Sequence, residues 1–165
     1  MTTLSSAEET QILDAHNKYR AEVATKYPVP PLSPLVWFAS LARAAQVWAN
    51  RLASEPRREY PHEPGITDGE NIARDFSAGD DVTGLVAGWA AEDRFFQNSA
   101  DGKFTFDHHG PGVSSTGNWA DVGHYTQMVW RNTTEVGCAR ATGPTGNYLV
   151  ARYRPPGNYD DESVF

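Results

Sequence analysis

The chain has 165 residues, which is enough for one well-formed core and too few for two ordinary domains, so we expect a single domain over residues 1–165. Hydrophobic residues make up 39% of the chain and include five tryptophans, which favours a packed globule over a disordered segment. The net charge of −7 argues against nucleic acid as a partner, because phosphate binding needs clustered Lys and Arg.

The first ten residues, MTTLSSAEET, lack the charged start and the apolar run of a signal peptide. Two interpretations follow: the chain is cytoplasmic, or it is a mature secreted form whose leader has been replaced by Met1. The single cysteine, Cys138, cannot form an internal disulfide and so leaves the compartment open.

Helical spacing of apolar residues predicts three helices in the first hundred residues. The first covers residues 6–25. The second begins with Ser33 as its cap and Pro34 in its first turn, and ends at Pro56. The third starts after Asp80 or Asp81 and carries an apolar stripe through position 96.

Glu92 falls on the apolar stripe of the third predicted helix, where a carboxylate is unusual. An ionised carboxylate is rarely buried without a partner, because its desolvation costs several kcal/mol. Its partner could be a histidine, which would form a shared His/Glu site, or an arginine.

The second half of the chain predicts strands. The stretch KFTF at 103–106 is interpreted as a short strand, and GHYTQMVWRN at 123–132 as a short helix. Residues 134–141 and 147–153 predict two strands joined by the turn GPTG at 143–146, while Pro155 and Pro156 prevent a central strand from continuing. Helices followed by strands indicate an α+β fold.

Four residues are candidates for chemistry: His62, Glu70, Glu92 and His124. None of them belongs to a local motif with metal-ligand spacing, since HEPGI is not H-E-x-x-H. Other polar residues have simpler interpretations. We expect His16 to be a hydrogen-bonded core histidine and Cys138 a small core hydrophobe, whereas the pair His108 and His109 is either exposed or able to scavenge metal.

Four segments together resemble the CAP superfamily, which comprises cysteine-rich secretory proteins, antigen 5 and the pathogenesis-related class one proteins. They are HNKYR (16–20), GENI (69–72), GHYTQMVWRNT (123–133) and YLVARYRPPGNY (148–159), in the family's order and spacing. The resemblance runs from about residue 6 to residue 160. It implies a three-layer α-β-α sandwich with a central antiparallel sheet, and a cleft that holds His62, Glu70, Glu92 and His124.

The resemblance also implies a function and a compartment. It favours a secreted, non-enzymatic binding protein in defence, signalling or host interaction, with Zn²⁺ or another divalent metal on His62 and His124 and with Glu70 and Glu92 in support. A sterol or fatty acid would lie between helices, away from that cleft. Ala151 stands where the family often has cysteine, which leaves Cys138 without a mate and makes this a disulfide-poor member.

Two other interpretations of the same four residues remain open. One is a metal-dependent protease or esterase, in which a metal-bound water attacks the substrate beside a carboxylate base. The other is a buried polar network that fixes the loops around the core. The sequence does not specify an oligomeric state.

Overall fold

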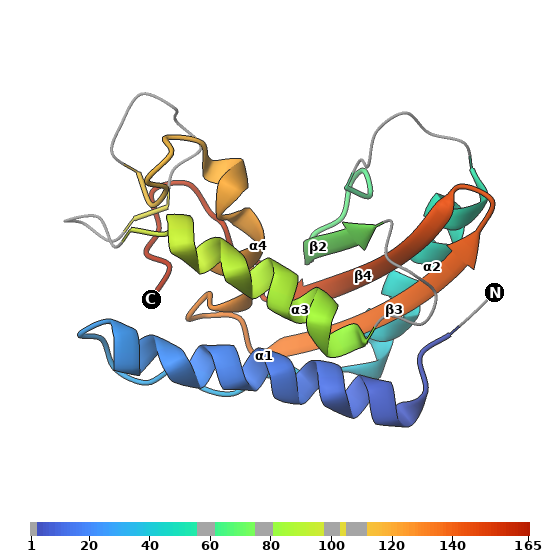
Figure 1. Ribbon diagram of the computed structural model, residues 1–165, viewed down its shortest axis with the longest axis horizontal. Helices are drawn as coiled ribbons and strands as arrows, with labels where there is room; N and C mark the ends of the chain where they lie inside the picture. Colours follow the sequence, from blue (N-terminus) through green and yellow to red (C-terminus); the bar gives the residue numbers. More distant parts are fainter. Residues whose placement is uncertain (1–2, 56–61, 75–80, 98–102, 105–111) are drawn as a thin grey trace.

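The computed structural model describes residues 3–55, 62–74, 81–97, 103–104 and 112–165 (Figure 1). Four strands form one sheet in the order β1-β3-β4-β2. The strands are β1 (Val36–Trp37), β2 (Gly69–Arg74), β3 (Glu135–Gly143) and β4 (Gly146–Arg154). β4 pairs antiparallel with both β2 and β3, whereas β1 runs parallel to β3, so the sheet is mixed at one edge.

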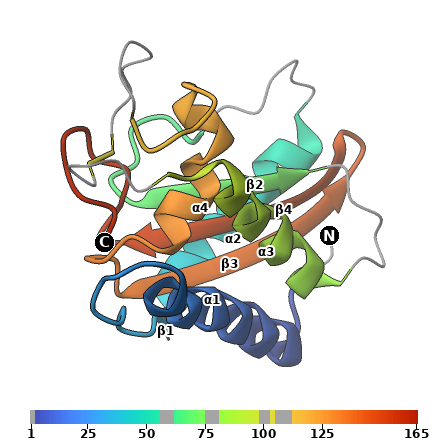
Figure 2. The ribbon, with the colours of Figure 1, turned by 60° about the vertical axis from the view of Figure 1, so that its left-hand side comes forward.

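Helices cover both faces of this sheet, which confirms the predicted α-β-α sandwich (Figure 2). α2 (Ala39–Ser54) packs on one face; α1 (Ser6–Lys26), α3 (Val82–Ala90) and α4 (Gly123–Met128) lie on the other. Side chains alternate along a strand. Cys138 therefore belongs to the core under α1, and Ala139 to the core under α2.

The predictions for the first helix, for the start of the third helix and for the hairpin are confirmed. A capping box between Ser5 and Glu8 begins α1, where each residue's side chain bonds the other's backbone N–H. Asp81 caps α3 by accepting from the Thr83 backbone N–H. β3 and β4 meet at the predicted turn, where Gly143 lies opposite Gly146.

The predicted start of the second helix was wrong. Ser33 and Pro34 precede a strand, because the β-branched Val36 and the aromatic Trp37 pair with β3 instead of entering a helix. The backbone N–H of Val36 donates to the Thr134 carbonyl at 2.9 Å. The helix then begins at Ala39, without a side-chain cap.

Three further differences concern the other segments. α3 ends at Ala90 and a 3₁₀ turn over Ala91–Phe95 follows. The α-helical spacing of the apolar residues therefore stops at Ala90, and Glu92 is half-buried rather than a core residue. The strand β2 was not predicted from local pattern. Residues 105–106 of the KFTF stretch lie outside the described residues, and Lys103 forms an isolated bridge with Ser163.

His16 and Cys138 are both buried in the core, as predicted. The His16 Nδ1 lies 2.8 Å from the Ile12 carbonyl, which can only accept, so Nδ1 carries the proton. Nε2 then accepts from the Tyr153 hydroxyl at 2.8 Å. Burial lowers the pKa of His16 to about 4, and the ring is therefore neutral at physiological pH. Among the described residues, no helix is both long and apolar enough to traverse a bilayer.

Candidate functional site

A cavity of about 150 Å³ brings together three of the four residues singled out from the sequence. His62, Glu70 and His124 line it, together with Asn71, Trp119 and Asn158. Glu92 contacts His124 from the 3₁₀ turn after α3. Residues far apart in the chain therefore form one site. His108 and His109, the other histidine pair considered from the sequence, lie outside the described residues.

Glu92 fixes both the ring and the backbone of His124. Its Oε1 lies 2.6 Å from the ring Nδ1, and its Oε2 accepts from the backbone N–H groups of His124 and Tyr125 at 2.9 and 3.1 Å. These N–H groups belong to the first turn of α4, which has no side-chain cap of its own. Trp89 stacks beside the ring, with centroids 6.1 Å apart.

Glu70 holds His62 in a similar way on the opposite wall. Its Oε1 lies 2.8 Å from the His62 Nδ1 and accepts from the Glu63 backbone N–H at 3.1 Å. The Glu70 side chain is 2% exposed, whereas that of His62 is 64% exposed. The Glu70 carboxylate is therefore buried in the protein interior, whereas the His62 imidazole is exposed to solvent.

Arg152 completes this wall and was missed by reasoning from the sequence. It lies directly opposite Glu70 in the pairing of β2 with β4 and forms an ion pair with Oε2 of Glu70 at 2.9 Å. It also bonds Glu63, and its side chain is 1% exposed. The available signal was a lone arginine in the apolar run YLVARY, since a buried guanidinium needs an acidic partner.

A chain of hydrogen bonds links the cleft to the core. Asn71 donates from Nδ2 to the His124 carbonyl at 3.0 Å and to the Tyr153 hydroxyl at 3.1 Å. That hydroxyl in turn donates to His16. Asn158, on the far rim, donates to the Gly123 carbonyl and accepts from Thr126, which anchors α4.

Both imidazoles have the form that a metal ligand needs. A carboxylate accepts from each Nδ1, so that nitrogen carries a proton, and in the neutral ring Nε2 then has the free lone pair. In the part of the chain that the structure describes, no three His, Cys, Asp or Glu side chains are grouped around one ion position. Because His62 and His124 line the same cavity, the donors that the site could offer a metal are two imidazole nitrogens, and water or a ligand would have to complete the shell.

A second hollow lies between α1 and α3, away from this cleft. It has a volume of about 580 Å³. Ala15, Lys18 and Tyr19 line it from α1, and Gly84 and Ala87 from α3. A side chain added at Gly84 would meet nothing within 4 Å, so space remains along this wall.

Comparison with known proteins decides the family. The model of the CAP family, described as the cysteine-rich secretory protein family, matches residues 13–153. The chain belongs to this family. The resemblance expected from its four segments is thereby confirmed.

Relatives of this CAP chain come from insects and plants. It is 32% identical to venom allergen 5 of Vespa velutina, over 98% of this chain and 81% of that protein. It is 37% identical to pathogenesis-related protein 1A of Nicotiana tabacum, over 93% of this chain and 78% of that protein.

Solved structures agree on the CAP fold. BmVAL-1 has a TM-score of 0.76 at 24% identity and covers 98% of this chain and 83% of its own. NaASP2, solved with Zn²⁺, has a TM-score of 0.75 at 22% identity and covers 98% of this chain and 86% of its own.

The lone cysteine of this CAP chain has a defined place in the sheet. Cys138 on β3 lies directly opposite Ala151 on β4, and both side chains are buried. The position where the family often has a second cysteine is thus adjacent to the first. Alanine fills it without leaving a polar group in the core.

Proposed function

We propose that this CAP protein is a secreted, non-enzymatic binding protein whose cleft takes one divalent metal ion, with zinc as the first candidate, on Nε2 of His62 and His124. The observation that carries the proposal is the pairing of each imidazole Nδ1 with a carboxylate, Glu70 or Glu92. Such carboxylate–histidine pairs orient metal ligands and raise their basicity. NaASP2, which was solved with Zn²⁺, lends support.

The relatives support secretion and a role in defence or host interaction. The family is described by its secretory proteins, and the relatives include venom allergens and a pathogenesis-related protein. These relatives support secretion over the cytoplasmic alternative that the lone cysteine left open.

The engagement of both carboxylates argues for binding over hydrolysis. Oε1 of Glu92 is bonded by the His124 ring and Oε2 by two backbone N–H groups. Glu70 is shared between His62, the Glu63 backbone and Arg152. A general base must take a proton from water, and here both oxygens of Glu92 and Oε1 of Glu70 are hydrogen-bonded, while Oε2 of Glu70 is ion-paired with Arg152. A bound zinc ion would act as a Lewis acid that holds an anionic or carbonyl oxygen of the ligand.

Calorimetric titration with Zn²⁺ near neutral pH tests the metal site. We expect one ion per chain in the wild type and no binding at this site in the His62→Ala/His124→Ala double variant. The matched control is His108→Ala/His109→Ala, which removes the same number of imidazoles and should leave binding unchanged. Equal binding by the wild type and the first variant would overturn the proposal. Turnover of a peptide or ester, lost in Glu70→Gln, would establish the hydrolase instead.

We further propose that the hollow between α1 and α3 binds a fatty acid. Its size suits an alkyl chain, and Ala15, Gly84 and Ala87 supply small walls. Lys18 offers an ammonium group for the fatty-acid carboxylate, whereas Asp14 and Asp81, which also line the hollow, add negative charge.

Two glycines of α3 provide a matched test of the fatty-acid site. Gly84→Leu should fill the hollow and abolish binding of a fluorescent fatty acid, whereas Gly88→Leu should not. Gly88 lies on the same helix, has equal free space around it and does not line the hollow. If both variants retain binding, the fatty acid does not occupy this hollow.

A further inference from the structure

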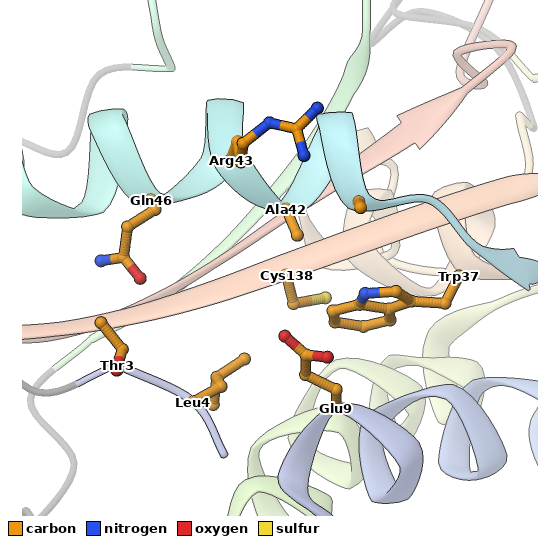
Figure 3. A pocket seen from close by; sticks show the side chains of 9 residues that line it. Thr3, Leu4, Glu9, Trp37, Ala42, Arg43, Gln46 and Cys138 are labelled. Atoms are coloured by element: carbon orange, nitrogen blue, oxygen red, sulfur yellow. The ribbon is translucent and has the colours of Figure 1, made fainter. Parts of the chain in front are cut away.

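A third pocket opens at the β1 edge of the sheet, between the two helical layers (Figure 3). Its volume is about 370 Å³. Five segments contribute to its lining: the residues before α1, α1 itself, β1, α2 and β3. The lining residues used below are Leu4, Glu9, Trp37, Ala42, Gln46 and Cys138. It shares no residue with the His–Glu cleft.

The short length of β1 creates this pocket. β1 ends at Trp37, which pairs with Val136, so β3 continues beyond the reach of its neighbour. Further along the same edge, Gln46 replaces the missing strand by donating from Nε2 to the Arg140 carbonyl at 3.1 Å. Peptide groups point alternately to either side of a strand, so the Cys138 carbonyl faces this edge, as those of Val136 and Arg140 do. The pocket therefore contains a backbone acceptor.

Glu9 adds a negative charge that no described residue compensates. Its carboxylate points into the pocket, toward Trp37 and Cys138 (Figure 3). Within the described ranges, no side chain forms an ion pair with it. The neighbouring Glu8, by contrast, caps α1 and pairs with Arg140 at 2.8 Å. The exposed Arg43 directs its guanidinium away from Glu9 in Figure 3.

The thiol of Cys138 adds no second charge. Burial, together with the charge of Glu9, raises the pKa of Cys138, so the thiol stays protonated. What remains is one carboxylate beside an indole ring, with apolar walls from Leu4 and Ala42. An indole face attracts cations, and a carboxylate accepts charge-assisted hydrogen bonds from them.

We propose that this pocket binds a small organic cation, a primary ammonium group on an apolar or aromatic body. The ammonium donates to the Glu9 carboxylate and the Cys138 carbonyl and lies against the Trp37 ring. The apolar body contacts Leu4 and Ala42. A cavity of about 370 Å³ lies within the range of about 300–1,000 Å³ that is typical of small-molecule sites.

The probe for this site is phenethylamine, compared with 2-phenylethanol and 3-phenylpropionate, which keep the body and change the charge. We expect phenethylamine to shift the indole N–H resonance of Trp37 and to bind at least about tenfold more tightly than the alcohol, since the charge supplies the difference. The carboxylate analogue should not bind. Equal affinity for the amine and the alcohol would overturn the proposal.

Variants separate charge from shape at this pocket. Glu9→Gln should weaken phenethylamine binding at least about tenfold and leave the alcohol unchanged. Glu162→Gln, the same change at an exposed residue that does not line the pocket, should have no effect. Ala42→Leu, whose side chain points into the pocket, should block all binding. Unaltered binding by Glu9→Gln or by Ala42→Leu would contradict the assignment.

Discussion

Glu92 and His124 are joined at two points: ring Nδ1 to Oε1 at 2.6 Å, and backbone N–H to Oε2 at 2.9 Å. One carboxylate thereby orients an imidazole and caps the helix that carries it. The consequence is that the position of the His124 ring depends on the segment after α3, 32 residues earlier in the chain.

Removal of this carboxylate should weaken both the fold and the metal site. We expect Glu92→Ala to lower the free energy of unfolding by about 2 kcal/mol, because two helix N–H groups and a ring N–H lose their acceptor. Zinc affinity should fall by roughly 10- to 100-fold through lost orientation of His124. Thermal denaturation and calorimetry measure these effects. Asp93→Ala, which removes a neighbouring carboxylate with only a surface ion pair, should change each of them little.

The ion pair of Glu70 with Arg152 predicts strong coupling between the two residues. Both side chains are nearly inaccessible, at 2% and 1% exposure. We expect Arg152→Met to lower the free energy of unfolding by about 3–5 kcal/mol, because it leaves a buried carboxylate uncompensated. In the Glu70→Gln/Arg152→Met double variant, part of this loss should be recovered. Denaturant unfolding of the four proteins measures the coupling, and strictly additive losses would show that the residues act independently.

His16 predicts a stability that depends on pH in a definite window. Its pKa is about 4 in the fold, where burial lowers it, against 6.5 for an ordinary histidine. The unfolded chain therefore binds more protons between these values, and the free energy of unfolding falls as pH drops from about 6.5 to about 4, by up to roughly 1.4 kcal/mol per pH unit. Above pH 7 the contribution of His16 to the free energy of unfolding no longer changes with pH.

Denaturant unfolding at several pH values tests this effect. His16→Gln has no titrating group, so the difference between wild type and variant isolates His16 from the carboxylates that titrate nearby. That difference should vary with pH only below about 6.5. A difference that is constant from pH 4 to 7 would show that the ring is charged or absent from the core.

The packing of α2 on β3 depends on a glycine. A Cβ at Gly137 would lie 2.3 Å from the Ala42 backbone N, and a main-chain atom of a packed helix cannot move away easily. Gly137→Ala should therefore lower the free energy of unfolding by about 3 kcal/mol. Gly88→Ala on α3 meets nothing within 4 Å and should raise the free energy of unfolding by about 0.5–1 kcal/mol. Thermal shifts of opposite sign are the expected result.

Sequence reasoning succeeded where the determining contacts are local. Helical spacing, the Asp81 cap and the turn at 143–146 specify α1, the start of α3 and the hairpin without reference to the rest of the chain. Prediction from the sequence failed where a segment far away in the chain determines the local secondary structure. Val36 and Trp37 leave a helical pattern because β3 offers them a parallel partner, and this partner lies about a hundred residues away.

The same distinction applies to the candidate site. The unusual position of Glu92 indicated that a partner must exist, and the three atoms that bond it come from α4. Arg152 was missed because its role depends on the register of β2 against β4, which places it opposite Glu70. No local pattern contains that register.

X-ray absorption of the one-to-one zinc complex tests the central claim most directly, because it counts the imidazoles bound to the ion. We predict two histidine nitrogens at about 2.0–2.1 Å from the zinc ion, with oxygen completing the shell. We also expect His62→Ala and His124→Ala each to remove one of these nitrogens. A zinc ion with no imidazole ligand, or with the same number in both single variants as in the wild type, would contradict the assignment of the cleft as the metal site.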